Sequence, residues 1–324
     1  MGSRDRESRV RVDLTAVVIA VREGTPCVLT VEASAQPAIA LPSGPLEPGH
    51  QSLQSGLRSW VERQTQHPLG YVEQLYTFGD RATAQLEPDV ASQQKAISIT
   101  YLALVASTDP PRQGRWRNWY DFFPWEDMRA GVPAARDPLL KRLKSWAGKP
   151  GRPTNKRRLE RARLTFGIGD APWDEERVLE RYELLYEAGL VPEAFVDRGT
   201  QPPSRINNAV SGLPMVSDHR RILATAISRL RAKIKYRPVL FELMPPAFTL
   251  SELQKTAEAL SGIPLHKQNF RRLIAQQGLV EETGEVAMDT GGRPAKLVRF
   301  RREVTLERPA PGVRVSATRR GSYP

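Results

Sequence analysis

The sequence has few of the residues that build disulfides and metal sites. Its 324 residues include one cysteine and four histidines. A single thiol, Cys27, excludes an intramolecular disulfide and a zinc site made of several cysteines. Cys27 lies in an apolar, strand-like run, which favours a buried core position for it. The histidines are scattered without metal-ligand spacing, so we expect no metal site.

Long apolar runs are also missing. No stretch approaches the roughly 20 apolar residues of a membrane-spanning helix. The N-terminus, Met1 to Arg6, lacks the apolar core of a signal peptide, and Arg6 breaks the N-myristoylation pattern. We therefore expect a soluble, cytoplasmic protein with no membrane partner. Hydrophobic residues still form 40% of the chain, so we expect the cores of about two domains.

Acidic residues are too few to balance the basic ones. The chain has 48 Lys and Arg against 36 Asp and Glu, a net charge of +12. Residues 219–302 alone hold 16 Lys and Arg and 7 Asp and Glu. Such an excess favours an anionic partner, either nucleic acid or a membrane surface. A second basic run, residues 149–163, is interpreted as a solvated linker or helix face.

A two-helix pattern lies inside this basic C-terminal region. Thr249 and Glu252 have the spacing of a capping box, which starts a helix. Gly262 and Pro264 break the chain after about three turns. The apolar residues between them fall on one helical face: Leu253, Ala257 and Leu260.

The second helix has Phe270, Leu273 and Ile274 on its inner face, and Gly278 can end it in a left-handed conformation. Two short helices with a tight turn form a helix-turn-helix pattern. Arg pairs with guanine and Asn or Gln with adenine in the major groove. Residues 279–302 then predict a hairpin, or wing. The expected DNA contacts are Lys267, Gln268, Asn269, Arg271, Arg272, Arg293 and Lys296. The alternative is a solvated basic helix in a small domain.

The N-terminal part has β-strand patterns with one helix. Strands are expected at residues 12–21, 27–31, 71–78 and 96–105, and a helix at 52–64. Next comes an aromatic cluster interpreted as a core or a packed lid: Trp116, Trp119, Tyr120, Phe122, Phe123 and Trp125. Further amphipathic helices are predicted at 138–146, at 174–188 with Asp174 as N-cap, and at 218–235.

The segment from Gly44 to Gln66 resembles the Nudix box of hydrolases that act on nucleoside diphosphates linked to other groups. That pattern is Gly, five residues, Glu, seven residues, Arg-Glu, an apolar residue, one residue, Glu-Glu, one residue, Gly. Gly44, Arg58 and Glu62 match it, and Trp60 takes the apolar position. Three carboxylate positions are lost, and so is the final glycine: His50, Ser59, Arg63 and Thr65.

The lost carboxylates decide what this resemblance implies. Magnesium needs several hard oxygen ligands to polarise a pyrophosphate, and here Glu62 stands beside Arg63 instead of a second carboxylate. The metal site is therefore expected to be absent or very weak, and the chain is expected not to be an enzyme. Arg58 and Glu62, spaced i,i+4, are expected to survive as a structural pair. A fold kept without its metal cluster suggests a site kept for binding.

Several runs in order along the chain extend the resemblance to nearly its whole length. The chain resembles the Nudix-related transcriptional regulators of NAD metabolism, the NrtR group, and is closest to the NadQ branch. The runs are residues 73–81, 101–104, 119–127, 180–189, 218–225, 233–238 and 266–272.

This resemblance implies an α+β architecture. It begins with a degenerate Nudix-like α/β/α sandwich with a mixed sheet at 1–148, which binds the effector. A helical linker or dimerisation segment at 149–235 follows, then a winged helix-turn-helix at 236–303 and a flexible tail at 304–324.

The implied function is a homodimeric repressor of NAD-biosynthesis genes that binds palindromic double-stranded operator DNA. The effector is expected to be a nucleotide: NAD, ADP-ribose or ATP. Aromatic rings stack on adenine and Arg pairs with phosphate, so the candidate effector residues are Tyr76, Phe78, Asp80, Arg81, Trp116 and Trp119. Two alternatives stay open: an active pyrophosphohydrolase with a nucleic-acid-binding tail, and an RNA-binding protein.

Overall fold

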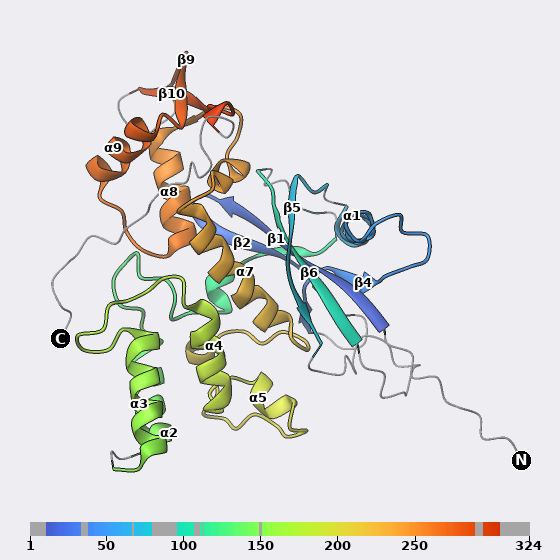
Figure 1. Ribbon diagram of the computed structural model, residues 1–324, viewed down its shortest axis with the longest axis vertical. Coiled ribbons are helices and arrows are strands. Elements are labelled where there is room, and N and C mark those ends of the chain that lie inside the picture. Colours follow the sequence, from blue (N-terminus) through green and yellow to red (C-terminus); the bar gives the residue numbers. More distant parts are fainter. Residues whose placement is uncertain are drawn as a thin grey trace, which may run out of the picture.

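The computed structural model describes residues 11–33, 38–66, 68–79, 96–106, 111, 113–148, 151–288 and 294–304. Its N-terminal part is a seven-stranded mixed sheet (Figure 1). The main strand order is β3-β2-β1-β6-β5, with β4 beside β1 and β7 beside β2. β1 and β6 are parallel and the other pairs are antiparallel. The strands are β1 (Arg11–Arg22), β2 (Thr25–Glu32), β3 (Ile39–Ala40), β4 (Ser43–Pro45), β5 (Tyr71–Phe78), β6 (Ala96–Leu104) and β7 (Arg115–Asn118).

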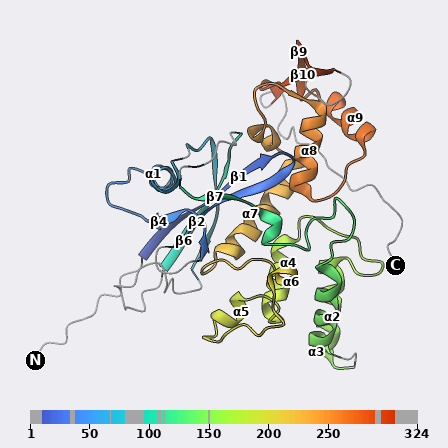
Figure 2. The same ribbon diagram turned by 180° about the vertical axis from the view of Figure 1, so that it is seen from behind.

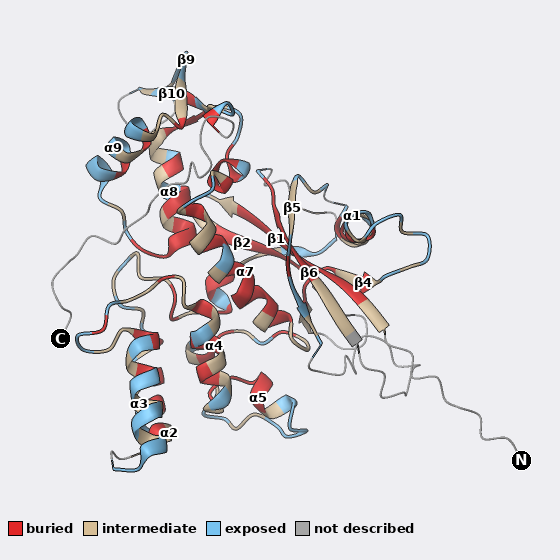
Figure 3. Cartoon of the chain, viewed as in Figure 1, coloured by how far each residue is buried: buried red, intermediate tan, exposed pale blue. Residues whose placement is uncertain are grey.

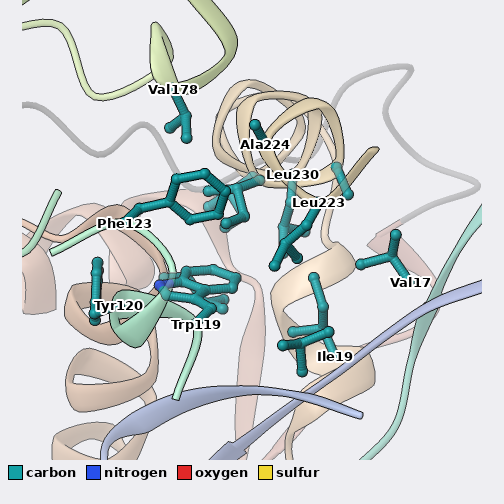
Figure 4. Packing of buried hydrophobic residues seen from close by; sticks show 14 of the residues in the cluster. Val17, Ile19, Trp119, Tyr120, Phe123, Val178, Leu223, Ala224 and Leu230 are labelled. Atoms are coloured by element: carbon teal, nitrogen blue, oxygen red, sulfur yellow. The ribbon is translucent and has the colours of Figure 1, made fainter. Parts of the chain in front are cut away.

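Both faces of this sheet are covered. β1 is buried from Asp13 to Ala20 because its alternating side chains enter two different clusters. Val18 packs with Leu57 of α1 (Leu53–Thr65), whereas Val17 lies in the cluster that contains Trp119. Figure 4 shows Val17 and Ile19 on that second side, below α7 (His219–Ile234). The expected sandwich with a mixed sheet is confirmed.

Helices form the middle of the chain. The helix predicted at 138–146 is α2 (Arg136–Ala147). The basic run at 149–163 forms most of α3 (Pro153–Phe166), which lies against α2 (Figure 2). The sequence boundary near residue 149 therefore falls in the connection between two packed helices. The other elements are η1 (Trp119–Asp121), α4 (Val178–Glu187), α5 (Glu193–Val196) and α6 (Asn208–Ser211).

One predicted helix start was wrong. Asp174 is not the N-cap of α4, which begins at Val178. The Asp174 carboxylate instead accepts a hydrogen bond from the backbone N–H of Glu176 at 3.0 Å and binds the Arg177 guanidinium. An Asp side chain that bonds the backbone two residues on forms a turn as readily as a helix cap. The amphipathic character predicted for this helix is confirmed, because Val178, Tyr182 and Leu185 are buried.

The C-terminal part is a winged helix-turn-helix. Its elements are η2 (Val239–Leu243), β8 (Phe248–Thr249), α8 (Leu250–Ser261), α9 (Lys267–Gln277), β9 (Val280–Ala287) and β10 (Ala295–Phe300). Thr249 and Glu252 form the expected capping box, and Gly262 and Gly278 end the two helices with positive φ. β8, β10 and β9 form a three-stranded sheet, in which β9 and β10 are the predicted wing.

The three parts share one apolar interior. A single cluster contains Val17 of β1, Tyr182 of α4, Leu230 of α7 and Phe270 of α9. Figure 3 shows α7 as a largely buried helix beside the sheet and α8 buried at the end nearest the sheet. Burial of this kind fixes the winged helix against the Nudix-like sheet. Among the described residues, no helix has the length and apolar character needed to cross a membrane.

Candidate nucleic-acid interface and effector site

The second helix of the winged helix, α9, turns a polar face to solvent. Phe270 and Ile274, spaced i,i+4, are 4% and 1% exposed and hold the helix against the core. The side chains on the other faces are therefore free to meet a ligand. The predicted DNA contacts Lys267, Gln268, Asn269, Arg271 and Arg272 are all exposed, as are Ala275 and Gln276.

The wing carries cations that are already paired. Lys296 on β10 binds both carboxylate oxygens of Glu282 on β9, at 2.8 and 2.9 Å. Arg299 donates to Glu281 at 2.6 Å. A cation paired in this way offers a phosphate less net charge than an unpaired one. Arg293, the predicted wing-tip contact, lies outside the described residues.

The Nudix-box residues pack into a closed structural unit. A Cβ added to Gly44 would lie 2.2 Å from the Trp60 indole, so the ring occupies the space that a side chain would need. Trp60 Nε1 donates to the Pro45 carbonyl at 2.8 Å. Arg58 donates to the backbone carbonyls of residues 69 and 70. The predicted Arg58–Glu62 pair was therefore wrong, because these carbonyls take the guanidinium.

A cation stands where the Nudix pattern has its second adjacent carboxylate. Arg63 lies over the Trp60 ring, 4.0 Å from its centroid, and binds Glu47 at 3.2 Å. His50 Nδ1 accepts from the Glu47 backbone N–H at 3.1 Å, and its Nε2 lies 3.5 Å from the Glu47 carboxylate. Within the described ranges, no group of three His, Cys, Asp or Glu could hold a metal ion.

A polar cavity of about 370 Å³ lies at the edge of β2 that faces away from β1. Along this edge β7 pairs with the first part of β2 and β3 pairs with its end. Arg117 Nε is buried there and makes no hydrogen bond within the described part of the chain. Burial raises the pKa of the nearby Asp121 carboxyl, and the Arg117 guanidinium partly offsets that rise. The two guanidinium groups suit a phosphate-bearing ligand. The polar lining residues are Thr30, Glu32, Gln64, Gln113, Arg115 and Arg117.

The predicted effector residues do not gather in one place. Trp116 is on β7, half-buried against the cluster that contains α1. Tyr76, 52% exposed, and Phe78 are on β5, at the opposite edge of the sheet. Trp119 is fully buried in the core, edge-to-face with Tyr120. Asp80 and Arg81 lie outside the described residues.

Trp119 therefore has no open ring face for an adenine, because core packing covers it. The prediction missed Arg115 and Arg117, which flank Trp116 and meet the cavity from one side of β7. Their alternation was visible in the sequence, but the pairing of β7 with β2 was not. A larger groove of about 750 Å³ lies between α3 and α4, away from the Nudix-like sheet. Its lining mixes basic side chains with three carboxylates, Glu160, Glu180 and Glu183, so we favour the smaller polar cavity beside the sheet as the effector site.

Comparison with known proteins assigns the C-terminal module. Residues 240–300 match the family model of the NrtR DNA-binding winged helix domain. The C-terminal module is a winged helix of the NrtR type. The matched residues contain the whole of α8, α9, β9 and β10. The exposed face of α9 therefore belongs to a domain type that binds DNA.

A curated relative and two solved structures extend this comparison. The chain is 43% identical over 88 residues to the ADPR responsive transcriptional repressor NtrR of Acinetobacter baylyi. The match spans 27% of this chain and 35% of that relative, about a third of its length.

The fold is similar to the crystal structure of NrtR from Shewanella oneidensis, with a TM-score of 0.53 at 19% identity, covering 90% of this chain and 95% of that chain. It is also similar to that NrtR complexed with a 27mer DNA, with a TM-score of 0.51 at 19% identity, covering 91% and 95%. The fold is therefore NrtR-like: a Nudix-like domain followed by a winged helix.

Proposed function

We propose that this chain is a transcriptional repressor that binds operator DNA and senses a nucleotide through a non-catalytic Nudix-like domain. The observation that carries the proposal is the NrtR-type winged helix, whose helix α9 presents the predicted DNA contacts Lys267, Gln268, Asn269, Arg271 and Arg272 to solvent. The resemblance of the whole chain to regulators of NAD metabolism supports NAD-biosynthesis genes as its targets. Net charge of +12 supports an anionic partner.

In this proposal α9 lies in the major groove. Arg271 and Arg272 then meet guanine edges or phosphates, and Gln268 and Asn269 meet adenine. Lys267, near the N-terminus of the helix, contacts the backbone. The wing contributes Lys296 and Arg293 as backbone or minor-groove contacts. A homodimer on a palindromic site would place two copies of α9 at a fixed half-site spacing.

ADP-ribose is the proposed effector, supported by the similarity to the ADPR responsive repressor of Acinetobacter baylyi. NAD and ATP contain the same adenosine diphosphate and are the comparison ligands. The proposed site is the cavity beside β7, with its two guanidinium groups on the diphosphate. Trp116 lies between those two arginines in sequence and is the nearest of the predicted aromatic residues along the chain. Tyr76 and Phe78 would belong to a separate surface.

The chain is proposed not to hydrolyse its effector. Arg63 is stacked on Trp60 and paired with Glu47, so a cation occupies the place where the family pattern has a metal-binding carboxylate. A bound nucleotide would then keep its pyrophosphate intact. A sensor needs such a ligand, because a hydrolysed effector could not report its own concentration.

The test begins with selection of duplexes from a random library by the full-length protein. The expected result is enrichment of a palindromic sequence. ADP-ribose, NAD and ATP are then titrated while the affinity for that duplex is measured by fluorescence anisotropy. ADP-ribose is expected to change the affinity by about 5–150-fold, the range of typical allosteric coupling. Failure to enrich any sequence would contradict the proposal, and enrichment without a nucleotide response would leave a DNA-binding protein that is not a sensor.

A further inference from the structure

The turn between the two DNA-binding helices is held by groups that lie outside the winged helix. A helix ends with carbonyls that have no partner inside it. At the end of α8, the Ala259 carbonyl accepts from Tyr120 Oη at 2.8 Å and the Leu260 carbonyl accepts from Arg231 Nε at 2.8 Å. The Gly262 carbonyl accepts from the backbone N–H of Met128 at 2.7 Å. Three carbonyls of this one turn are thus bound by the rest of the chain.

A buried ion network fixes the donors. Glu126, 1% exposed, accepts from Arg231 Nη1 at 2.8 Å and from Arg181 Nη2 at 2.9 Å. Arg181 also donates to the carbonyls of Thr165 and Asp174. Buried charges are tolerated only when they are paired in good geometry. The donors to the turn therefore have little freedom to shift without breaking this network.

The backbone of the turn lies in close contact with Glu126 and Tyr120. Gly262 has a φ of 72°, and a Cβ there would lie 2.6 Å from the Glu126 carbonyl oxygen and 2.8 Å from Tyr120 Oη. A displacement of the backbone near Glu126 would therefore push directly on the turn. Because α9 starts at Lys267, a few residues later, such a push would reorient the proposed recognition helix.

The same stretch of chain borders the polar cavity at its other end. Arg115 and Arg117 of β7 line the cavity. Asn118 then caps η1 by accepting from the Tyr120 backbone N–H at 3.0 Å. Trp119 anchors η1 in the packed interior, where Figure 4 shows it near Phe123. Residues 115–128 thus connect the cavity to the turn, and most of the chain between these two places is buried.

We propose that residues 115–128 carry the effector signal to the helix-turn-helix, with Tyr120 and Arg231 as its positioning residues. This inference rests on the proposed function, because it needs a nucleotide in the cavity and DNA on α9. A phosphate bound by Arg117 would pull on the end of β7, which leads directly into η1. The intervening chain would move against the turn. The helices α4 and α7 then serve as the frame, and α7 contributes Arg231 to the contact.

The experiment measures coupling in the full-length protein. ADP-ribose affinity is determined by calorimetry with and without the duplex selected above, and the ratio is the coupling factor. Tyr120→Phe removes the hydroxyl that donates to the Ala259 carbonyl and accepts from Arg231 Nη2 at 3.4 Å, and keeps the ring. The matched control is Tyr186→Phe, which removes the hydroxyl bound to Asp197 at 2.8 Å, away from the winged helix. Arg231→Lys is a second variant that keeps a charge beside Glu126 and loses the Nε donor.

In Tyr120→Phe the coupling factor is expected to be about five-fold closer to unity than in the wild-type protein. A five-fold change corresponds to the net free energy of about one hydrogen bond. Arg231→Lys should shift it in the same direction, while Tyr186→Phe should keep the wild-type factor. Wild-type coupling in both Tyr120→Phe and Arg231→Lys would overturn the inference and leave the proposed function intact. A wild-type protein without coupling would contradict the proposed function itself.

Discussion

Arg63 shows how one residue can change the chemistry of a motif. Stacked on Trp60 and paired with Glu47, it places a guanidinium where the Nudix pattern has a carboxylate. We predict that ADP-ribose and NAD incubated with Mg²⁺ or Mn²⁺ are not hydrolysed at ordinary enzyme rates, about 1 per second or more. Product analysis by chromatography measures this directly. Turnover in that range would show that the metal site is assembled from other groups.

A triple variant extends this prediction. His50→Glu, Ser59→Glu and Arg63→Glu together restore the family's carboxylates at those positions. We expect the variant to bind Mn²⁺ more tightly than the wild-type protein, because hard cations require several oxygen ligands. Thr65 still replaces the final glycine of the pattern, so recovered hydrolysis is not expected. Calorimetric titration with Mn²⁺ gives the comparison, and equal affinities would mean that the loop geometry has also been lost.

His219 makes the stability of the fold depend on pH. Its Nδ1 accepts from the Leu41 backbone N–H at 2.9 Å, and burial lowers its pKa from 6.5 to about 4. Between those two pKa values His219 is protonated in the unfolded chain and neutral in the folded chain, so the free energy of unfolding falls as the pH falls. We predict a loss of about 3 kcal/mol in the free energy of unfolding between pH 7 and pH 4 from this residue.

The measurement is urea unfolding across that pH range. His219→Gln keeps a side-chain acceptor for Leu41 and cannot gain a proton, so its pH dependence should be flatter. His266→Gln, at an exposed position before α9, is the matched control and should keep the wild-type profile. Identical profiles for the wild-type protein and His219→Gln would mean that His219 becomes charged without cost.

At the scale of the elements, α9 and the wing are expected to contribute differently to DNA binding. Arg271 is exposed on α9, whereas Lys296 on β10 is paired with Glu282. We predict that Arg271→Ala weakens binding to the selected duplex by about 1–3 kcal/mol and relaxes specificity at one base pair. Lys296→Ala should cost less. Arg205→Ala, an exposed arginine outside the winged helix, should leave the affinity unchanged; a larger effect of Lys296→Ala would make the wing the main contact.

The wing pair itself gives a further prediction. Glu282→Gln removes the carboxylate that binds Lys296 and leaves the strand pairing of β9 and β10 in place. The released lysine is expected to add a phosphate contact, so affinity for scrambled duplexes should rise and the salt slope should steepen by about 1. Binding measured over a series of KCl concentrations gives the slope. An unchanged slope would show that the wing stays clear of the DNA.

Local signals explain which elements were predictable from the sequence. The capping box of Thr249 and Glu252 and the left-handed glycines at 262 and 278 defined α8 and α9 closely, because caps act through neighbours in the chain. The start of α4 was misplaced because Asp174 can form a turn as well as a cap. Within α1, the i,i+4 rule suggested a partner for Arg58, but a loop carbonyl after the helix was the actual acceptor.

The effector site was harder to predict than the DNA-binding helix. The exposed face of α9 follows from helical periodicity alone, and its predicted residues all lie on it. The cavity depends on β7 pairing with the outer edge of β2, which no local pattern encodes. The aromatic cluster was interpreted as a core or a packed lid, and all of its members except the half-buried Trp116 lie in the core, yet Trp119 was still proposed for the ligand. Only its burial among residues of the sheet and α7 separates these two roles.

For the molecule as a whole, the shared core predicts one cooperative unit. Glu126 precedes α2, Arg181 lies on α4 and Arg231 on α7, and the last of these also binds the end of α8. Removing one partner from a buried ion network costs about 3–5 kcal/mol, because the remaining charges lose their compensation. We predict that Glu126→Gln destabilises the entire chain by that amount.

Thermal unfolding followed by two fluorescence probes would test this prediction. Tryptophan fluorescence reports mainly on the Nudix-like part and the helices, since the six tryptophans precede residue 174. A fluorophore attached at an introduced cysteine, Gln276→Cys on exposed α9 with Cys27→Ala, reports on the winged helix. Both probes should show one transition at one temperature, and Glu126→Gln should lower that temperature for both. If the winged helix melted first and Glu126→Gln moved only the other transition, the contacts of Tyr120 and Arg231 with α8 would be too weak to carry a signal.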